Sequence, residues 1–578
     1  MTYYGGLYLK YLFPFFKKYK AECFFAPLFK MLESAFDLIV PLVVAKIINV
    51  GIVNGDSGYI FTRVGILILM ALLGLACSFT AQYFAAKAAT GTSAELRQNL
   101  LGHIQSLGFG ELDKIGASTL ITRLTADVNQ VQNGLNMFLR LFLRSPFIVF
   151  GAMIMAFMID FNTALIFAAV ILVLFVIVFV IMFVTNPIYK KQQKTLDAVT
   201  TSTRENLAGV RVVRAFGKEK EEFENFKNIN GALTKVQLHV GKISALMNPL
   251  TYVTVNLGII MILKIGSGKV ADGTLLSGDI VALVNYLSQI LVELIKLANL
   301  IVLLSKAIVS MVRIGQVLDM PCDMKYGDMT ESKKDVHEII KFEDVSFRYT
   351  QSSEYALESI SFAINKGETI GIIGGTGSGK STLINLIARY YDASKGKISF
   401  MGEPVSEWDK QTLRRKISVV AQKTQLFSGT VRSNLLFGKK NAADEEMMHA
   451  LEIAQAADFV LNKPKGLDCK VEQDGRNFSG GQKQRLSVAR AVISDSDVLI
   501  LDDSSSALDY ATDAAMRKAL KKLSPQKTVI IVSQRTSSIK HADRILVLDD
   551  GHLVGSGTHE ELLADCEVYR EIHESVTK

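Results

Sequence analysis

Residues Ala164 to Val184 form an apolar stretch without a single charged side chain. A helix needs about 20 apolar residues to cross the roughly 30 Å hydrocarbon layer of a membrane, whereas buried helices of soluble proteins have shorter apolar stretches. The chain as a whole is also too apolar for an ordinary soluble protein, with 49% hydrophobic residues and a mean hydropathy of +0.27. The stretch therefore predicts an α-helical membrane domain.

Further apolar stretches of similar length lie in the first half of the chain, and each is long enough to span a membrane. The longer segments between them, 89–137 and 188–243, are polar, helix-patterned and rich in Lys and Arg. The positive-inside tendency places these segments and the N-terminus in the cytoplasm. An even number of spans then leaves the C-terminal half in the cytoplasm as well. The six predicted spans are 22–53, 60–88, 138–160, 162–187, 244–267 and 278–304.

Several charged residues fall inside these spans. Intramembrane charges are costly, so they usually face a bundle interior, a partner or water. Glu33 and Asp37 are four residues apart and share a helix face. They could attract a cationic substrate, or they could pair with Lys30 or with another helix, and the sequence leaves both interpretations open. The charges are Lys30, Glu33, Asp37 and Lys46 in the first span and Glu293 and Lys296 in the sixth.

The second half of the chain contains a phosphate-binding motif. A strand-like run over 369–373 precedes a glycine-rich loop, and a helical stretch over 382–389 follows it. The loop fits G-x-x-x-x-G-K-[ST], in which backbone N–H groups surround the phosphates, the lysine reaches the β- and γ-phosphates and the hydroxyl ligates Mg²⁺. The flanking pattern argues against an ordinary Gly-rich turn. The residues expected to bind the nucleotide here are Gly374, Gly375, Thr376, Gly377, Ser378, Gly379, Lys380, Ser381 and Thr382.

A second motif places an acid at the end of a buried strand. The run Val498–Asp502 is typical of a Walker B strand, whose aspartate holds Mg²⁺ through water. Between the two motifs lies Phe478–Gln482, which is close to the LSGGQ signature of ATP-binding cassette (ABC) proteins. Residues 340–578 resemble that family in the order and spacing of its motifs. The resemblance assigns Tyr349 to adenine stacking, Gln422 to the Q-loop and Mg²⁺, and Ser506–Asp509, with Asp509, to the D-loop.

The resemblance also implies a dimer, because two cassettes of this family close head to tail around two ATPs. Ser479 and Gly481 would then reach the nucleotide held by the opposite cassette. The signature opens a helix, whose N-terminal amides and dipole favour a phosphate. The signature residues expected at the nucleotide are Ser479, Gly480, Gly481 and Gln482.

Two residues depart from the family pattern at catalytic positions. Asp503 stands where the family has a glutamate that polarises the attacking water, and its side chain is one methylene shorter. Gln534 stands where the family has a histidine, and an amide cannot carry a proton or a positive charge. Neutral drift in a working enzyme is the alternative. The two changes together indicate a degenerate site, like that of one subunit of heterodimeric ABC exporters.

Two cytoplasmic segments resemble the intracellular loops of ABC exporters in residues as well as length. They are Gly116–Val128 and Glu205–Phe216. The resemblance implies that short coupling helices in these loops rest on the cassettes. A pair of solvated helical hairpins would account for the charge of these segments but not for their pattern.

These observations predict a multi-domain membrane protein, with a six-helix transmembrane domain over 1–317, a linker over 318–338 and an α/β P-loop nucleotide-binding domain over 339–578. It is expected in the cell membrane as a multi-pass protein that binds ATP and Mg²⁺ and exports small lipophilic or drug-like compounds across the lipid bilayer. Its expected partner is a homologous half-transporter with the catalytic Glu and His. The alternatives are a siderophore importer of the same fold, an ATP-gated channel or regulatory subunit, and a slow homodimer. The net charge of +8 gives no reason to expect nucleic acid, and the scattered cysteines suggest no zinc site or disulfide framework.

Overall fold

The computed structural model describes residues 11, 13–322, 324–332, 337–349, 352, 354–504, 508–523 and 527–577. The chain divides into two compact units. The membrane unit comprises residues 1–105 and 118–319, and the cassette unit comprises residues 106–117 and 320–578. Part of the first cytoplasmic extension therefore belongs to the same compact unit as the C-terminal domain.

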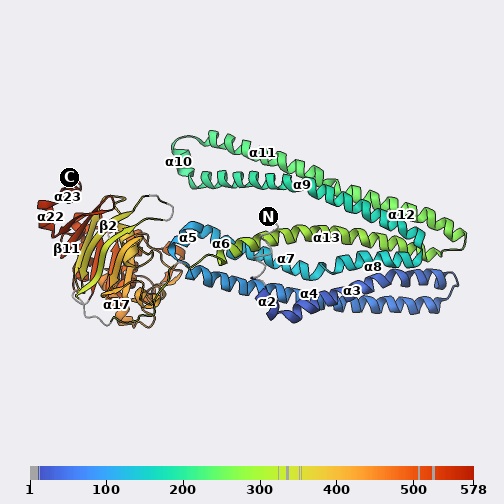
Figure 1. Cartoon of the computed structure of the whole chain (residues 1–578), viewed down its shortest axis with the longest axis horizontal. Coiled ribbons are helices and arrows are strands. Elements are labelled where there is room, and N and C mark those ends of the chain that lie inside the picture. The colour runs from blue at the N-terminus through green and yellow to red at the C-terminus, as the bar shows by residue number, and fades with distance from the viewer. Residues whose placement is uncertain are drawn as a thin grey trace. The chain divides into compact units, whose positions relative to one another are not determined.

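Long helices build the membrane unit, and Figure 1 shows α9 running alongside α11 and α12. Among the described residues, six helical segments are long and apolar enough to cross a membrane, which confirms the predicted spans. The helices continue beyond the apolar windows, so that span and cytoplasmic extension form one helix. Their bounds are α2 (Phe13–Lys18), α3 (Lys20–Lys46), η2 (Ile47–Ile52), α4 (Ser57–Ser106), α6 (Ala117–Thr122), η3 (Arg123–Asp127), α7 (Val128–Leu141), α8 (Arg144–Ile159), α9 (Phe161–Ala208), α10 (Val210–Ala215), α11 (Glu219–Ala245), α12 (Met247–Ala271) and α13 (Ser277–Leu318).

Helix α13 lies at the centre of this unit, in contact with α3, α7, α8 and α12. Tyr286 of α13 is fully buried, and its hydroxyl donates to the Leu38 carbonyl at 2.6 Å. Large apolar side chains on the outer faces stay exposed, for example Phe61 and Phe79 of α4 and Phe183 of α9. This distribution suits a bundle whose outer surface faces lipid rather than water.

The cassette unit contains a six-stranded sheet with the order β12-β11-β3-β10-β9-β6. The strands from β11 to β6 are parallel, and β12 pairs antiparallel at the edge. The predicted strands over 369–373 and 498–502 are confirmed as β3 (Thr369–Gly374) and β9 (Val498–Asp502). The other strands are β6 (Ile417–Val420), β10 (Thr528–Val532), β11 (Arg544–Asp549) and β12 (His552–Gly557).

An antiparallel sheet of order β2-β1-β4-β5 and a short β7–β8 pair complete the strands. The predicted helix over 382–389 is α14, which runs from Lys380 to Ile387 and ends early because Arg389 has a φ of +49°. The bounds are β1 (Glu338–Phe347), β2 (Leu357–Asn365), β4 (Lys395–Phe400), β5 (Glu403–Pro404), β7 (Gly429–Thr430) and β8 (Lys470–Val471), with helices α5 (Phe109–Ile115), α15 (Lys410–Lys416), α16 (Val431–Leu435), α17 (Asp444–Ile453), α18 (Ala457–Leu461), η4 (Gly466–Asp468), η5 (Gln473–Gly475), α19 (Gly480–Val492), α20 (Tyr510–Lys521), α21 (Thr536–Ile539), α22 (His559–Asp565) and α23 (Glu567–Thr577).

Part of the predicted linker lies against the cassette. Gly327 donates its backbone N–H to the Ser406 carbonyl at 2.9 Å, and Met329 donates to Glu407 at 3.1 Å. A Cβ on Gly327 would come within 2.2 Å of the Glu407 carbonyl oxygen, so this close approach requires glycine. Residues 323 and 333–336 of the linker lie outside the described residues.

Candidate nucleotide-binding site

Four parallel strands bring the predicted site residues to one edge of the sheet. β3 is followed by the glycine-rich loop, β9 by Asp503, β10 by Ser533 and Gln534, and β6 by Gln422 two residues after its end. The carboxyl ends of parallel strands form the crevice in which open α/β sheets bind their ligands. The topology therefore places residues from four separate parts of the cassette sequence around one crevice.

The phosphate loop has a backbone that only glycine accommodates at several positions. Gly377 and Gly379 have φ angles of +87° and +95°. A Cβ on Gly374 would lie 2.1 Å from the Leu548 carbonyl oxygen, and one on Gly379 would lie 2.7 Å from that of Ala356. Close packing on strand β11 and on the segment before β2 fixes the loop at the N-terminus of α14, where backbone N–H groups are available for an anion.

The side chains that follow the loop supply one cation and a set of oxygen ligands. The Lys380 ammonium donates to the carbonyls of Gly374 and Gly375. Burial lowers the pKa of Lys380, although Asp502 and Asp503 oppose this shift. The Ser381 hydroxyl lies 3.4 Å from the Asp502 carboxylate. Burial, together with the neighbouring Asp503, raises the pKa of Asp502, while Ser381 and Lys380 oppose this shift.

Asp503 is held from three directions. Its carboxylate accepts a hydrogen bond from the Gln422 amide at 3.2 Å, and its backbone carbonyl accepts one from the Gln484 side chain at 3.1 Å. Its backbone N–H donates to the Val532 carbonyl of β10 at 3.0 Å. The φ angle of +46° is left-handed, a conformation in which Asp is several-fold enriched among non-glycine residues. The local backbone thus favours the shorter acid at this position.

Gln534 and Tyr349 flank the same edge. Gln534 is exposed and follows Ser533, whose backbone N–H donates to the Ile372 carbonyl of β3 at 3.1 Å. The Tyr349 hydroxyl lies 3.1 Å from the hydroxyl of Thr382 in α14. Its ring meets Tyr391 edge to face, with 5.4 Å between the ring centroids. Tyr349 therefore lies beside α14, and Gln534 follows the strand that neighbours β3.

The signature segment forms the N-terminal cap of α19. Ser479 is exposed, its hydroxyl accepts from the Gln482 backbone at 3.4 Å, and the Gln482 amide oxygen accepts from the Ser479 backbone at 3.1 Å. Gly480 is also exposed, whereas Gly481 is partly buried. This exposed helix N-terminus presents backbone N–H groups outward, which suits a ligand brought by another molecule.

Asp509 caps a different helix. Its carboxylate accepts hydrogen bonds from the backbone and the hydroxyl of Thr512, both at 2.8 Å, at the start of α20. These hydrogen bonds lower the pKa of Asp509. Residues 505–507, which include most of the predicted D-loop before it, lie outside the described residues.

Contacts with helix α5 were not predicted from the sequence. The Tyr391 hydroxyl donates to the Asp113 carboxylate at 2.5 Å. The Phe109 ring lies 4.6 Å from that of Tyr390, centroid to centroid, and the Arg414 guanidinium covers Tyr390 at 4.3 Å. Helix α5, a short helix from the first cytoplasmic segment, thus packs within the cassette unit. The exporter-loop pattern begins at Gly116, after this helix.

The two cytoplasmic motifs differ in their surroundings. In the first, Arg123 pairs with the buried Asp127 at 2.7 Å, and Ser310 of α13 donates to Asp127 at 2.8 Å. The motif residues thereby hold the extension against α13. The second motif contains the short helix α10 between α9 and α11, where Val212 and Phe216 are exposed.

The arrangement agrees with known sequences. The family model of the ABC transporter transmembrane region matches residues 23–294, and a second family model, described as ABC transporter, matches residues 357–506. The sequence is 35% identical over 97% of both chains to the uncharacterised ABC transporter ATP-binding protein YfiB of Bacillus subtilis. The chain belongs to the ABC transporter family.

Other relatives of this ABC transporter include a Staphylococcus aureus protein named for multidrug export as an ATP-binding/permease protein, 31% identical over 98% of this chain and 99% of that one. A solved structure of a bacterial Atm1-family ABC exporter with ATP bound superposes with a TM-score of 0.78 over 97% of this chain and 98% of that one. At 22% identity, this likeness concerns the fold. The transporter is thus a multi-pass membrane protein of the ABC exporter type, and the predicted architecture is confirmed.

Proposed function

We propose that this ABC transporter is one half of a heterodimeric exporter and that its own nucleotide site binds ATP better than it hydrolyses it. The observation that supports this proposal most directly is the geometry of Asp503. The Asp503 carboxylate is one methylene shorter than glutamate, engages the Gln422 amide at 3.2 Å and arises from a left-handed backbone. A general base must come within about 2.6–3.2 Å of the proton it takes. A shorter side chain anchored in this way is poorly suited to reach an attacking water.

Gln534 adds to this deficiency. It follows β10 at the position where family members carry a histidine, and its amide can donate and accept hydrogen bonds without taking up a proton. Asp503 and Gln534 follow neighbouring parallel strands, whose ends are joined by the Asp503 to Val532 hydrogen bond. Both changes therefore affect the same part of one site.

The residues fit the binding of a magnesium nucleotide. The glycine-rich loop at the N-terminus of α14 and the Lys380 ammonium would hold the phosphates, and Tyr349 would stack on the base. Hard oxygen donors suit Mg²⁺, and Ser381, Asp502 and Gln422 supply a hydroxyl, a carboxylate and an amide oxygen. Bound ATP would supply the free energy for closing two cassettes. The exposed cap at Ser479 would complete the partner's site, in which we expect most hydrolysis.

The proposed cargo is a lipophilic or drug-like compound. The support comes from the names of relatives such as the S. aureus multidrug export protein and from the exporter-type fold.

The test compares the chain alone with the chain co-expressed with a homologous half-transporter that carries Glu and His at the matching positions. The purified single chain should show little ATPase activity, and the pair should be active. Replacing the partner's glutamate by glutamine should remove nearly all activity of the pair, whereas Asp503→Asn should remove little. Robust ATP hydrolysis and transport by the single chain would overturn the proposal in favour of a homodimer.

A further inference from the structure

A charged pocket lies within the membrane unit, among α3, α8 and α13. Its volume is about 310 Å³, at the lower end of the range for small-molecule sites. The polar part of its lining comprises Asp37 of α3, Arg144 of α8 and Gln289, Glu293 and Lys296 of α13, together with neutral polar residues. Ile148 and Val292 add aliphatic surface. Charged residues inside a membrane domain are expensive and commonly mark a functional site.

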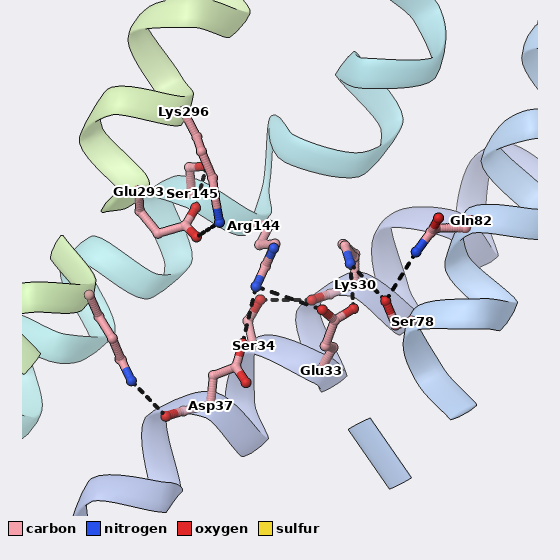
Figure 2. Close-up of polar contacts among 11 residues, drawn as sticks. Lys30, Glu33, Ser34, Asp37, Ser78, Gln82, Arg144, Ser145, Glu293 and Lys296 are labelled. Atoms are coloured by element: carbon pink, nitrogen blue, oxygen red, sulfur yellow. Dashed lines mark hydrogen bonds and ion pairs between the residues drawn. The ribbon is translucent and has the colours of Figure 1, made fainter. Parts of the chain in front are cut away.

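The charges in this pocket are paired, as one of the two interpretations left open by the sequence expects. Figure 2 shows Arg144 directed at Asp37, with 3.1 Å between the guanidinium and the carboxylate. Glu293 accepts from the Lys296 ammonium and from the Ser145 hydroxyl, both at 2.8 Å. The pocket thus has two cations and two anions and no net charge.

Glu33 and Lys30 extend the network away from the pocket. Lys30 is buried, pairs with Glu33 at 2.5 Å and donates to Ser78 of α4 at 3.2 Å. Glu33 also lies 3.7 Å from Arg144. The Lys30–Glu33 pair has no net charge. Glu33 and Asp37, the two carboxylates near the Arg144 guanidinium, both belong to α3, so α3 holds the guanidinium before any ligand arrives.

The members of each ion pair differ in their exposure. The side chains of Arg144 and Glu293 are 14% and 4% exposed, whereas those of Asp37 and Lys296 are 44% and 39% exposed. Each pair therefore has a buried anchor and an accessible partner of opposite charge. The accessible partners are one carboxylate on α3 and one ammonium on α13.

Two further polar atoms at the pocket lack a partner. Nε of Arg144 and Oε1 of Gln289 are buried and make no hydrogen bond within the part of the chain that the structure describes. Buried polar atoms without partners are costly, and each one in a native structure calls for an explanation such as a bound ligand or water.

We propose that this pocket binds a small amphipathic zwitterion, with its ammonium at Asp37, its carboxylate at Lys296 and its apolar body against Ile148 and Val292. The inference rests on the proposed export function and narrows its cargo to compounds that carry both charges. A lipophilic cation would engage Asp37 and leave the accessible Lys296 without a counter-charge from the ligand. A lipophilic anion would engage Lys296 and leave the accessible Asp37 without a counter-charge from the ligand. A zwitterion satisfies both accessible groups while the pocket stays neutral.

The first experiment uses three probes that differ in charge but hardly in size. They are the dipeptide leucylphenylalanine, its C-terminal amide as the singly charged cation, and its N-acetyl derivative as the singly charged anion. Equilibrium binding of each labelled probe is measured on the full-length protein in lipid nanodiscs, alone and with its partner chain. The zwitterion should bind about tenfold more tightly than either derivative, which corresponds to one additional favourable ion pair. Equal binding of the three probes, or no binding of the zwitterion, would overturn the proposal.

The second experiment removes one accessible charge of the pocket at a time and measures which of the three probes binds more weakly. Asp37→Asn should weaken the zwitterion and the amide but leave the N-acetyl derivative unaffected, whereas Lys296→Gln should weaken the zwitterion and the N-acetyl derivative but not the amide. Glu224→Gln and Lys242→Gln are matched controls, because they remove one charge each from the exposed surface of α11. Ion pairs with only a structural role would instead lower the melting temperature and affect all three probes equally, which would also refute the site.

Binding in these experiments requires no ATP hydrolysis. A transporter that proved to be a homodimer could still bind the zwitterion selectively. Conversely, a loss of selectivity would leave the result for the nucleotide site unchanged. The two proposals can therefore fail separately.

Discussion

The side-chain amide of Gln422 donates a hydrogen bond to the Asp503 carboxylate across 3.2 Å. Gln422 follows strand β6 and Asp503 follows strand β9, and these strands are parallel neighbours. The Gln484 side chain holds the Asp503 carbonyl on the other side. The acid that should activate water is thus positioned by two glutamines, and its left-handed backbone favours Asp over Glu.

The first prediction concerns restoration of this site. Asp503→Glu combined with Gln534→His should allow the assembled pair to hydrolyse ATP at a second site, because both missing groups are supplied. General acid–base groups contribute about 10²–10⁴-fold at the site they serve. The gain should fall below that range, because a glutamate with a φ of +46° costs about 1–2 kcal/mol in backbone strain.

Vanadate trapping of labelled nucleotide, resolved by chain, measures this gain directly. The single variants serve as controls, and each should trap less nucleotide than the double variant. Trapping that stays confined to the partner's catalytic site in the double variant would contradict the prediction.

A second prediction separates nucleotide binding from turnover. Lys380→Ala should weaken ATP binding at this chain's own site and leave part of the pair's hydrolysis, because Lys380 belongs to the site that we propose to be degenerate. Ser479→Arg should nearly abolish hydrolysis, because we propose that the exposed cap of α19 completes the partner's catalytic site. The measurements are nucleotide binding and ATPase activity at saturating ATP.

Matched surface changes control for general damage. Lys397→Ala and Ser575→Arg alter the same residue types on exposed positions of the cassette and should change neither property. If Lys380→Ala harmed ATPase activity more than Ser479→Arg did, the roles assigned to the two sites would have to be exchanged.

The sequence predicted the elements in which one physical signal is strong. Ala164–Val184 is apolar over a membrane thickness, and Val498–Asp502 combines a buried strand with a terminal acid. The helix bounds were less predictable. Hydropathy falls after residue 88, yet α4 continues to Ser106, because the hydrogen bonds of a helix do not depend on whether its surroundings are lipid or water.

Contacts between distant residues were not predictable from the sequence. Gln484 and Asp503 are 19 residues apart and Asp113 and Tyr391 are 278 apart, and no local pattern connects them. The left-handed backbone of Asp503 had no sequence signal either, since an aspartate occurs in many conformations. The charges at Glu33 and Asp37 could be identified as unusual, but their partner Arg144 became evident only from the packing of α8 on α3.

A third prediction concerns topology and uses single cysteines in a variant without the five native ones. Ser277→Cys at the start of α13 should be labelled from outside intact cells, and Ala215→Cys in α10 only after permeabilisation. Gly55 and Gly116 lie in suitable turns, but their φ angles of +66° and +78° make a cysteine there strained.

The removal of native cysteines has its own control. Cys469 and Cys566 are buried, so the cysteine-free variant must first be shown to retain its ATPase activity with the partner. Labelling of Ala215→Cys from outside intact cells would reverse the orientation inferred from the basic segments.

The last prediction concerns the contact between α5 and the cassette. The Tyr391 phenol donates to Asp113 at 2.5 Å, and burial together with the Asp113 carboxylate raises the pKa of Tyr391. Because this helix belongs to the first cytoplasmic segment, we expect its contact to transmit cassette movement to the membrane helices. Tyr391→Phe removes the hydrogen bond and retains the ring. Net contributions of hydrogen bonds to charged groups are about 1.5–3 kcal/mol, and exposure of Asp113 places this one at or below the lower end.

Tyr391→Phe and Phe109→Ala should therefore leave folding and basal ATPase activity of the pair nearly intact but reduce transport per ATP hydrolysed. The Phe109 change should have the larger effect, because it removes the ring that packs 4.6 Å from Tyr390. Asp113→Asn combined with Tyr391→Phe should be no worse than Tyr391→Phe alone, since both changes disrupt the same hydrogen bond. Tyr355→Phe, elsewhere on the cassette, is the control. Parallel assays of ATPase activity and vesicle transport would decide the matter: an unchanged ratio of transport to hydrolysis in Phe109→Ala would show that the α5 contact is structural and does not couple the two activities.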